Sequence, residues 1–177
     1  MAKVRTRDEY LQIFRKVVTK VKYSLENWDF EDINLASRGG SKRGAFILGS
    51  CFIDHLSCFY FGHSSTSSNY ACFVDRFLPM YNGQNMYTDL RCKLVHNYSL
   101  GNQYALTHNR SKLHLKKDID GKILINLKNF ITEIKQAKEQ YFAELKNDEQ
   151  LQINFAKWYI NGGVLVPVNS SVPPKKT

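Results

Sequence analysis

Residues 41–62 read SKRGAFILGSCFIDHLSCFYFG, and this stretch decides the fold. Ser41 can cap a helix at its N-terminus, and Gly62 is a typical C-terminal stop. Between them, apolar side chains fall on most faces of the predicted helix, among them Phe46, Ile47, Ile53, Leu56 and Phe59. A helix that is apolar all round is buried, so we expect this one to be the central helix of a mainly α-helical domain.

Further helical patterns lie on both sides of this stretch. Thr6 and Glu9 form a capping box, and the apolar spacing behind them predicts a helix over about residues 7–25. The other predicted helices are 70–78 with Asn69 as its cap, 84–96, a long helix that opens at Asn126 or Asn129, and 149–160. Because the connections are short, we expect an up-and-down bundle of four to five helices.

The apolar period changes between residues 104 and 127. Apolar and polar residues alternate there on both sides of Asp120-Gly121, and Asp-Gly between alternating runs predicts a β-hairpin. Its strands are expected at about residues 112–118 and 122–126. We therefore expect a single domain over residues 1–168 with a small β-hairpin insertion at about 112–126, followed by a disordered basic tail over 169–177.

The composition is basic, with 25 Lys and Arg against 16 Asp and Glu and a formal net charge of +9. This excess favours an anionic partner such as nucleic acid, but solubility explains it equally well because the charges are spread along the chain. The N-terminus does not resemble a signal peptide, and Asp54 and His55 interrupt the apolar run 45–61, so no membrane span is expected. The four cysteines form no C-x-x-C pair and lie mostly in apolar runs, which predicts buried, reduced thiols in a cytoplasmic protein.

One segment carries residues suited to chemistry. Residues 91–98 read RCKLVHNY, an R-x4-H-x-Y pattern at the end of the predicted helix 84–96. Over residues 90–98 the chain resembles the hallmark of HEPN domains, most closely the HepT toxin-type branch; beyond them the resemblance rests on helical architecture. It implies a homodimer whose cleft receives Arg91 and His96 from each copy. It also implies a metal-independent endoribonuclease, without a cofactor, in a toxin–antitoxin or defence system.

The residue types of the motif fit RNA cleavage. An imidazole, with a pKa near ~6.5, can transfer protons at neutral pH. A guanidinium can stabilise the charge of a phosphorane-like transition state. On an ideal α-helix, positions five apart differ by about 140°, so Arg91 and His96 would not share one face. They converge if the helix ends near His96 or if two protomers contribute, and the resemblance implies the second.

The neighbours of the pair leave alternatives open. Asn97 and Tyr98 are expected to line the cleft. In the HepT-type branch the matching tyrosine receives AMP from a nucleotidyltransferase antitoxin, which implies such a partner; otherwise Tyr98 packs its ring and hydrogen-bonds its hydroxyl. Cys92 stands where the family commonly has Asn, Asp or His, and is either a reactive thiol or a buried, inert one. It favours the alternative function, a non-catalytic module that dimerises and binds RNA, nucleotide or protein.

Two other clusters contain residues that can bind ligands. Cys51, His55 and Cys58 share one helix face, but without a close Cys pair a packed apolar helix is expected there and no metal site. A buried Asp54 or His55 needs a partner, and either could lie behind Arg91. A basic stretch near the hairpin could track a phosphate backbone or form a solvated face; its members are His108, Arg110, Lys112, His114, Lys116 and Lys117.

Overall fold

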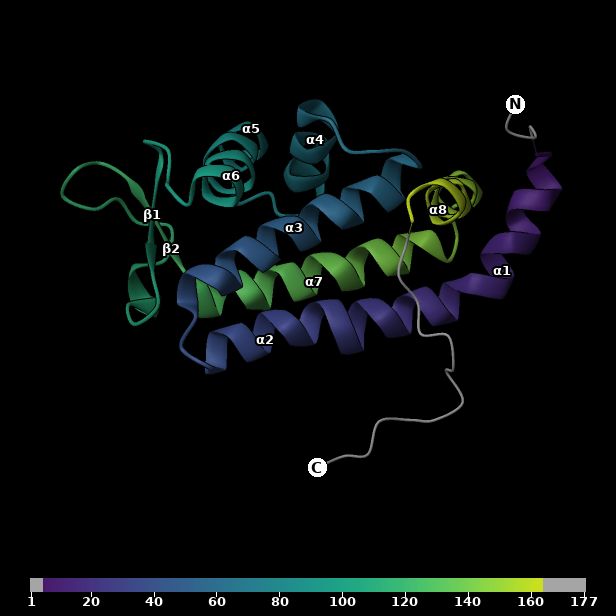
Figure 1. Cartoon of the computed structure of the whole chain (residues 1–177). Coiled ribbons are helices and arrows are strands. Elements are labelled where there is room, and N and C mark those ends of the chain that lie inside the picture. The colour runs from purple at the N-terminus through teal and green to yellow at the C-terminus, as the bar shows by residue number, and fades with distance from the viewer. Residues whose placement is uncertain (1–4, 164–177) are drawn as a thin grey trace.

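Helix α3 (Lys42–Phe61) forms the centre of the molecule (Figure 1). The computed structural model describes residues 5–163. The α-helices that pack on α3 include α2 (Phe30–Arg38), α4 (Ser67–Phe77), α7 (Leu127–Leu145) and α8 (Glu149–Asn161). Phe46, Ile53, Leu56 and Phe59 are buried among them, and Gly62 ends α3 in the left-handed conformation with φ 79°. The predicted central helix and the mainly α-helical fold are confirmed.

The first helix has its predicted bounds, but the chain continues as a helix beyond it. α1 (Arg7–Ser24) begins at the expected capping box, but the chain stays helical past Leu25 through a π-helical turn, η1 (Leu25–Asp29), into α2. The buried ammonium of Lys138, on α7, lies 3.2 Å from Glu26 and over the ring of Phe30. The predicted helix over about residues 7–25 is therefore confirmed as α1. The helical continuation through η1 and α2 was not predicted, because contacts from a distant helix support it where the local apolar pattern has stopped.

The next two helical segments differ from prediction in their details. α4 starts one turn earlier than expected, because the Thr66 side chain and not Asn69 caps it. The predicted helix 84–96 exists, but it is a continuous run of α5 (Gly83–Asn85), η2 (Met86–Leu94) and α6 (Val95–Asn97). Its middle part, η2, is π-helical. π-Helices are rare and occur frequently at functional sites.

The β insertion is present, but its strands pair differently from a hairpin. β1 (Tyr104–Thr107) runs parallel to β2 (Ile123–Asn126), with Tyr104 opposite Ile123. The predicted first arm, residues 112–118, contains a 3₁₀ turn, η3 (Ser111–Leu113), and a single antiparallel bridge from Lys117 to Ile123. The turn at Asp120-Gly121 does form. β2 matches the second predicted arm. β1 pairs with it in place of the first predicted arm, because the Tyr104 ring is buried in the core.

His114 anchors this insertion to the helices. Its Nδ1 accepts a hydrogen bond from the Asn126 amide at 3.0 Å, so its proton lies on Nε2, which is 2.9 Å from Oε1 of Glu133 on α7. The Tyr81 hydroxyl donates to the same carboxylate at 2.5 Å. The His114 side chain is only 7% exposed, so this member of the basic stretch points inward.

α3 is long and apolar enough to cross a membrane by length and composition, and 56% of that window is buried inside the molecule. The core helix of a soluble protein has the same properties. The predicted disordered tail, residues 169–177, lies outside the described residues, as do the last residues of the predicted domain.

Candidate functional site

The π-helix η2 brings the two motif residues together. Its i→i+5 hydrogen bonding stacks residues five apart in successive turns, whereas an α-helix separates them. Nη1 of Arg91 lies 2.9 Å from Nε2 of His96 within one chain. The same spacing places Cys92 beside Tyr87, whose pKa is raised first by its hydrogen bond with the Cys92 thiol and then by burial. Of the two expected routes to convergence, the structure shows contact within one chain, where the helical run ends at Asn97.

Asp54 of α3 holds Arg91 from the other side. Its Oδ2 accepts hydrogen bonds from Nε and Nη2 of Arg91 at 3.2 and 3.0 Å. Burial lowers the pKa of Arg91, but the carboxylate outweighs it and the pKa is raised. Of the two residues expected behind Arg91, Asp54 is thus the partner. His55 stacks on Phe59 instead, with the ring centroids 5.0 Å apart, and burial lowers its pKa.

The Arg91–His96 contact fixes the protonation of the imidazole. A guanidinium carries only donors, so Nε2 of His96 must accept the hydrogen bond and the proton of the neutral ring lies on Nδ1. The His96 side chain is exposed and Arg91 is partly so. A substrate can therefore reach both groups from solvent, and a protonated His96 has to leave Arg91.

Tyr98 lies at the end of this helical segment. α6 ends at Asn97, and Tyr98 follows in the left-handed conformation with φ 54°. Its ring is 58% exposed, and the guanidinium carbon of Arg43 lies 4.9 Å from the ring centroid. Within residues 5–163 its hydroxyl has no hydrogen-bond partner. Tyr98 is thus not a packed core aromatic, and Asn97 beside it is also exposed.

The motif segment contributes to two hollows in the surface. The Arg91 hollow, of about 500 Å³, is lined in part by Cys51, Asp54, His55, Cys58, Arg91 and Trp158. The Tyr98 hollow, of about 610 Å³, is lined in part by Lys42, Arg43, Phe46, Leu94, Tyr98 and His108. The first lies along α3, and the second lies between the start of α3, the end of the motif and β1.

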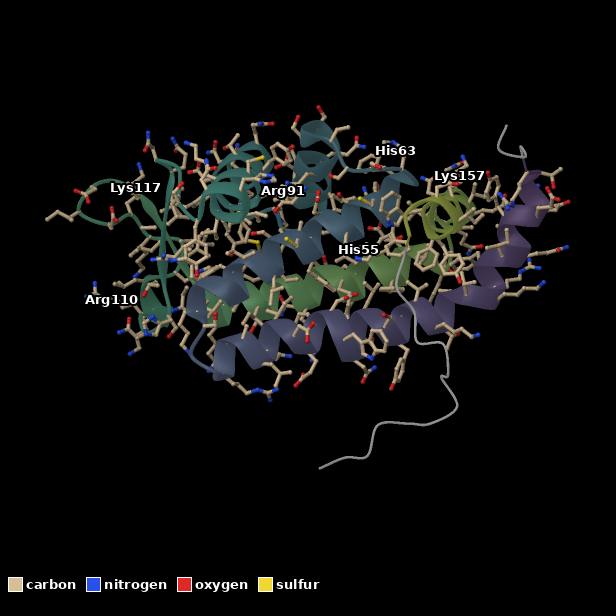
Figure 2. The ribbon with its side chains drawn as sticks, in the orientation of Figure 1. His55, His63, Arg91, Arg110, Lys117 and Lys157 are labelled. Carbon is tan, nitrogen blue, oxygen red and sulfur yellow. The ribbon has the colours of Figure 1, made fainter. Side chains whose placement is uncertain are left out.

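The predicted nucleic-acid-binding residues Arg110, Lys112, Lys116 and Lys117 are all exposed. Figure 2 shows Arg110 and Lys117 at the end of the molecule that carries the strands, whereas Arg91 lies over the middle of α3. The structure therefore does not bring these residues together with the motif pair. Of the basic stretch, only His108 belongs to a hollow that the motif also lines.

The four cysteines differ in their exposure. Cys58 is buried, Cys51 and Cys72 are exposed, and Cys92 is half-buried, so burial was wrongly expected for two of them. α3 and α4 each turn one face to solvent, which an apolar run does not reveal. Within residues 5–163, no three His, Cys, Asp or Glu side chains are grouped to hold a metal ion.

Arg43 is the site residue that sequence reasoning missed. Its signal was weak: a single arginine beside the Ser41 cap, far from the motif in the chain. Fold and site together define a mainly α-helical protein with an Arg–His pair, in which Arg91 belongs to the π-helix η2 and the exposed His96 belongs to α6 directly after it. No protein-family model, no curated protein and no solved structure matches this chain.

Proposed function

We propose that this protein is a HEPN-like, RNA-directed protein of the cytoplasm that acts as a metal-independent endoribonuclease. One observation carries the proposal: an arginine and a histidine, 2.9 Å apart, are accessible from solvent on a basic chain. RNA contains an internal nucleophile, the 2′-hydroxyl, so its cleavage needs proton transfer and charge stabilisation and no metal.

In the proposed reaction, the His96 imidazole turns away from Arg91, and its freed Nε2 accepts the proton of the 2′-hydroxyl as the hydroxyl oxygen attacks the adjacent phosphorus. The P–O bond to the 5′-oxygen breaks, and that oxygen takes a proton from solvent or from a second histidine. The products are a 2′,3′-cyclic phosphate and a 5′-hydroxyl end. Arg91 neutralises the charge on the non-bridging oxygens, and Asp54 positions its guanidinium.

The family resemblance extends the proposal to the assembly. A homodimer would place two Arg91–His96 pairs in one cleft, in a toxin–antitoxin or defence system. A nucleotidyltransferase antitoxin would then be a partner, with the free hydroxyl of Tyr98 as the acceptor of AMP. Sedimentation analysis of the purified chain tests the homodimer, and a monomer at all concentrations would contradict it.

The alternative is a non-catalytic HEPN-like module that dimerises and binds RNA or nucleotide. Two observations favour it. Cys92 supplies no strong hydrogen-bonding group beside the pair, and its thiol is engaged with Tyr87. Asp54 also offsets the positive charge of Arg91, which weakens the attraction for a phosphate.

The deciding experiment measures cleavage of single-stranded RNA in the presence of a metal chelator. We expect His96→Ala and Arg91→Ala to abolish cleavage, and His63→Ala to retain it. His63 is a matched control because it is exposed and lies beyond the end of α3, away from the motif (Figure 2). No cleavage by the wild type, or equal cleavage by wild type and His96→Ala, removes the catalytic claim; retained RNA binding would then favour the module.

A further inference from the structure

The Tyr98 hollow offers cations without a neighbouring carboxylate. Three side chains in its lining can carry positive charge, Lys42, Arg43 and His108, and within the described part of the chain no Asp or Glu lines it. The Lys42 ammonium is held by the Ser37 carbonyl, which fixes its position. This contrasts with the Arg91 hollow, where Asp29 and Asp54 contribute carboxylates. The lining of the Tyr98 hollow therefore attracts an anionic group more strongly than that of its neighbour.

Arg43 has its donors available for such a group. Its guanidinium lies against the Tyr98 ring, 4.9 Å from the centroid, and among residues 5–163 it forms no ion pair or hydrogen bond. Its N–H groups are therefore available to other acceptors. Those N–H groups match the oxygens of a phosphate in a bidentate geometry.

Tyr98 adds an aromatic surface to the same hollow. Tyr98 is 58% exposed, and the partly buried Leu100 and Leu106 add apolar surface to the lining. Aromatic rings in basic grooves stack the unpaired bases of single-stranded nucleic acid. The hollow can therefore bind the phosphate of a nucleotide at Arg43 and its base at Tyr98.

The position of the hollow relates it to the motif. Tyr98 follows His96 by two residues, and Leu94 precedes it by two, so the helix end that carries His96 forms one wall. We infer that the Tyr98 hollow is a subsite for one unpaired nucleotide of single-stranded RNA, adjacent to the phosphodiester bound at Arg91 and His96. This inference rests on the proposed function for its substrate.

Binding of a labelled single-stranded RNA, measured by fluorescence anisotropy, tests the subsite. All variants are made in a His96→Ala background, so that cleavage does not interfere. We expect Arg43→Gln and Tyr98→Ala each to weaken binding about tenfold, and Tyr98→Phe to retain it. Arg15→Gln is the matched control. Arg15 is exposed on α1, and its substitution removes the same charge far from the hollow. Circular dichroism confirms that each variant is folded.

Further arms separate the possible sources of the nucleotide. The same RNA annealed to its complement should bind more weakly, because paired bases cannot stack on Tyr98. Free AMP that displaces the RNA at an equal concentration would instead assign the hollow to a mononucleotide. The subsite is overturned if Arg43→Gln and Tyr98→Ala bind as well as Arg15→Gln, or if the wild type binds no RNA. If RNA binding depends on Arg43 and Tyr98 but the wild type does not cleave RNA, the proposed catalysis is overturned and the subsite stands.

Discussion

The Arg91 guanidinium lies between His96, five residues later in the same helix, and Asp54, on the central helix α3. Its Nη1 donates a hydrogen bond to the imidazole at 2.9 Å, and its Nη2 donates one to the carboxylate at 3.0 Å. The three side chains therefore form one line of contact from the core to the surface. A substitution of Asp54 should therefore change the position of the Arg91 guanidinium and, through it, its contact with His96.

Asp54→Ala should lower both stability and RNA cleavage. The Asp54 and Arg91 side chains are 17% and 28% exposed, so removing the carboxylate leaves a half-buried cation without its partner. We expect a loss of about 1–3 kcal/mol in the free energy of unfolding, measured in urea. Asp32→Ala, an exposed acid on α2, is the control. An Asp54→Ala protein as stable as Asp32→Ala would show that the pair contributes nothing.

Gly101→Ala should destabilise the connection between the motif and β1. A Cβ atom at Gly101 would lie 1.6 Å from Oδ1 of Asp89. The buried Asp89 carboxylate would have to move and release the Gln103 amide, which it holds at 2.8 Å. The expected loss is about 3 kcal/mol. Gly121→Ala serves for comparison: its Cβ meets open space and only the φ of 77° is strained, at about 1–2 kcal/mol. Equal melting temperatures for the two variants would refute the steric argument.

His114→Ala should loosen the β insertion. The substitution leaves the Asn126 amide and the Glu133 carboxylate, both in a largely buried network, without their common partner. We expect a loss of about 2–3 kcal/mol, with faster hydrogen exchange in β1 and β2 than in α3. His108→Ala, an exposed histidine of the same insertion, should leave both measurements near wild type. Unchanged exchange in His114→Ala would mean that the insertion is held elsewhere.

Cys58 should make the protein less stable in alkali. Burial raises the pKa of its thiol from 9.0 to about 11. Between these two values the unfolded chain loses the proton while the folded chain keeps it, so the free energy of unfolding falls as the pH rises. Urea titrations at pH 9 and pH 11 measure this change. We expect a smaller fall in Cys58→Ala than in the wild type, and an identical fall in both would contradict the shift.

Local sequence patterns predict much of the fold. The capping box at Thr6, the apolar faces of residues 41–62 and the Gly62 stop each involve residues within one or two turns of one another, so neighbours in sequence are enough to specify them. The location of the motif at the end of a helix is of the same kind. These features are all present in the structure.

Other features depend on contacts between distant parts of the chain. The parallel pairing of β1 with β2 needs Tyr104 in the core and His114 on Glu133, and neither follows from the alternation that predicted a hairpin. The pairing of Arg43 with Tyr98 joins positions on two elements that only the packed bundle brings together.

The sequence by itself determined that this is a mainly α-helical protein around residues 41–62, with an Arg-x4-His-x-Tyr motif at a helix end. The tertiary structure alone decided that this helix is π-helical, that Arg91 therefore meets His96, and that Asp54 holds the pair. The physical reason is that helix periodicity and capping depend on adjacent residues, whereas the helix type and the partners of a charged side chain depend on what packs against them.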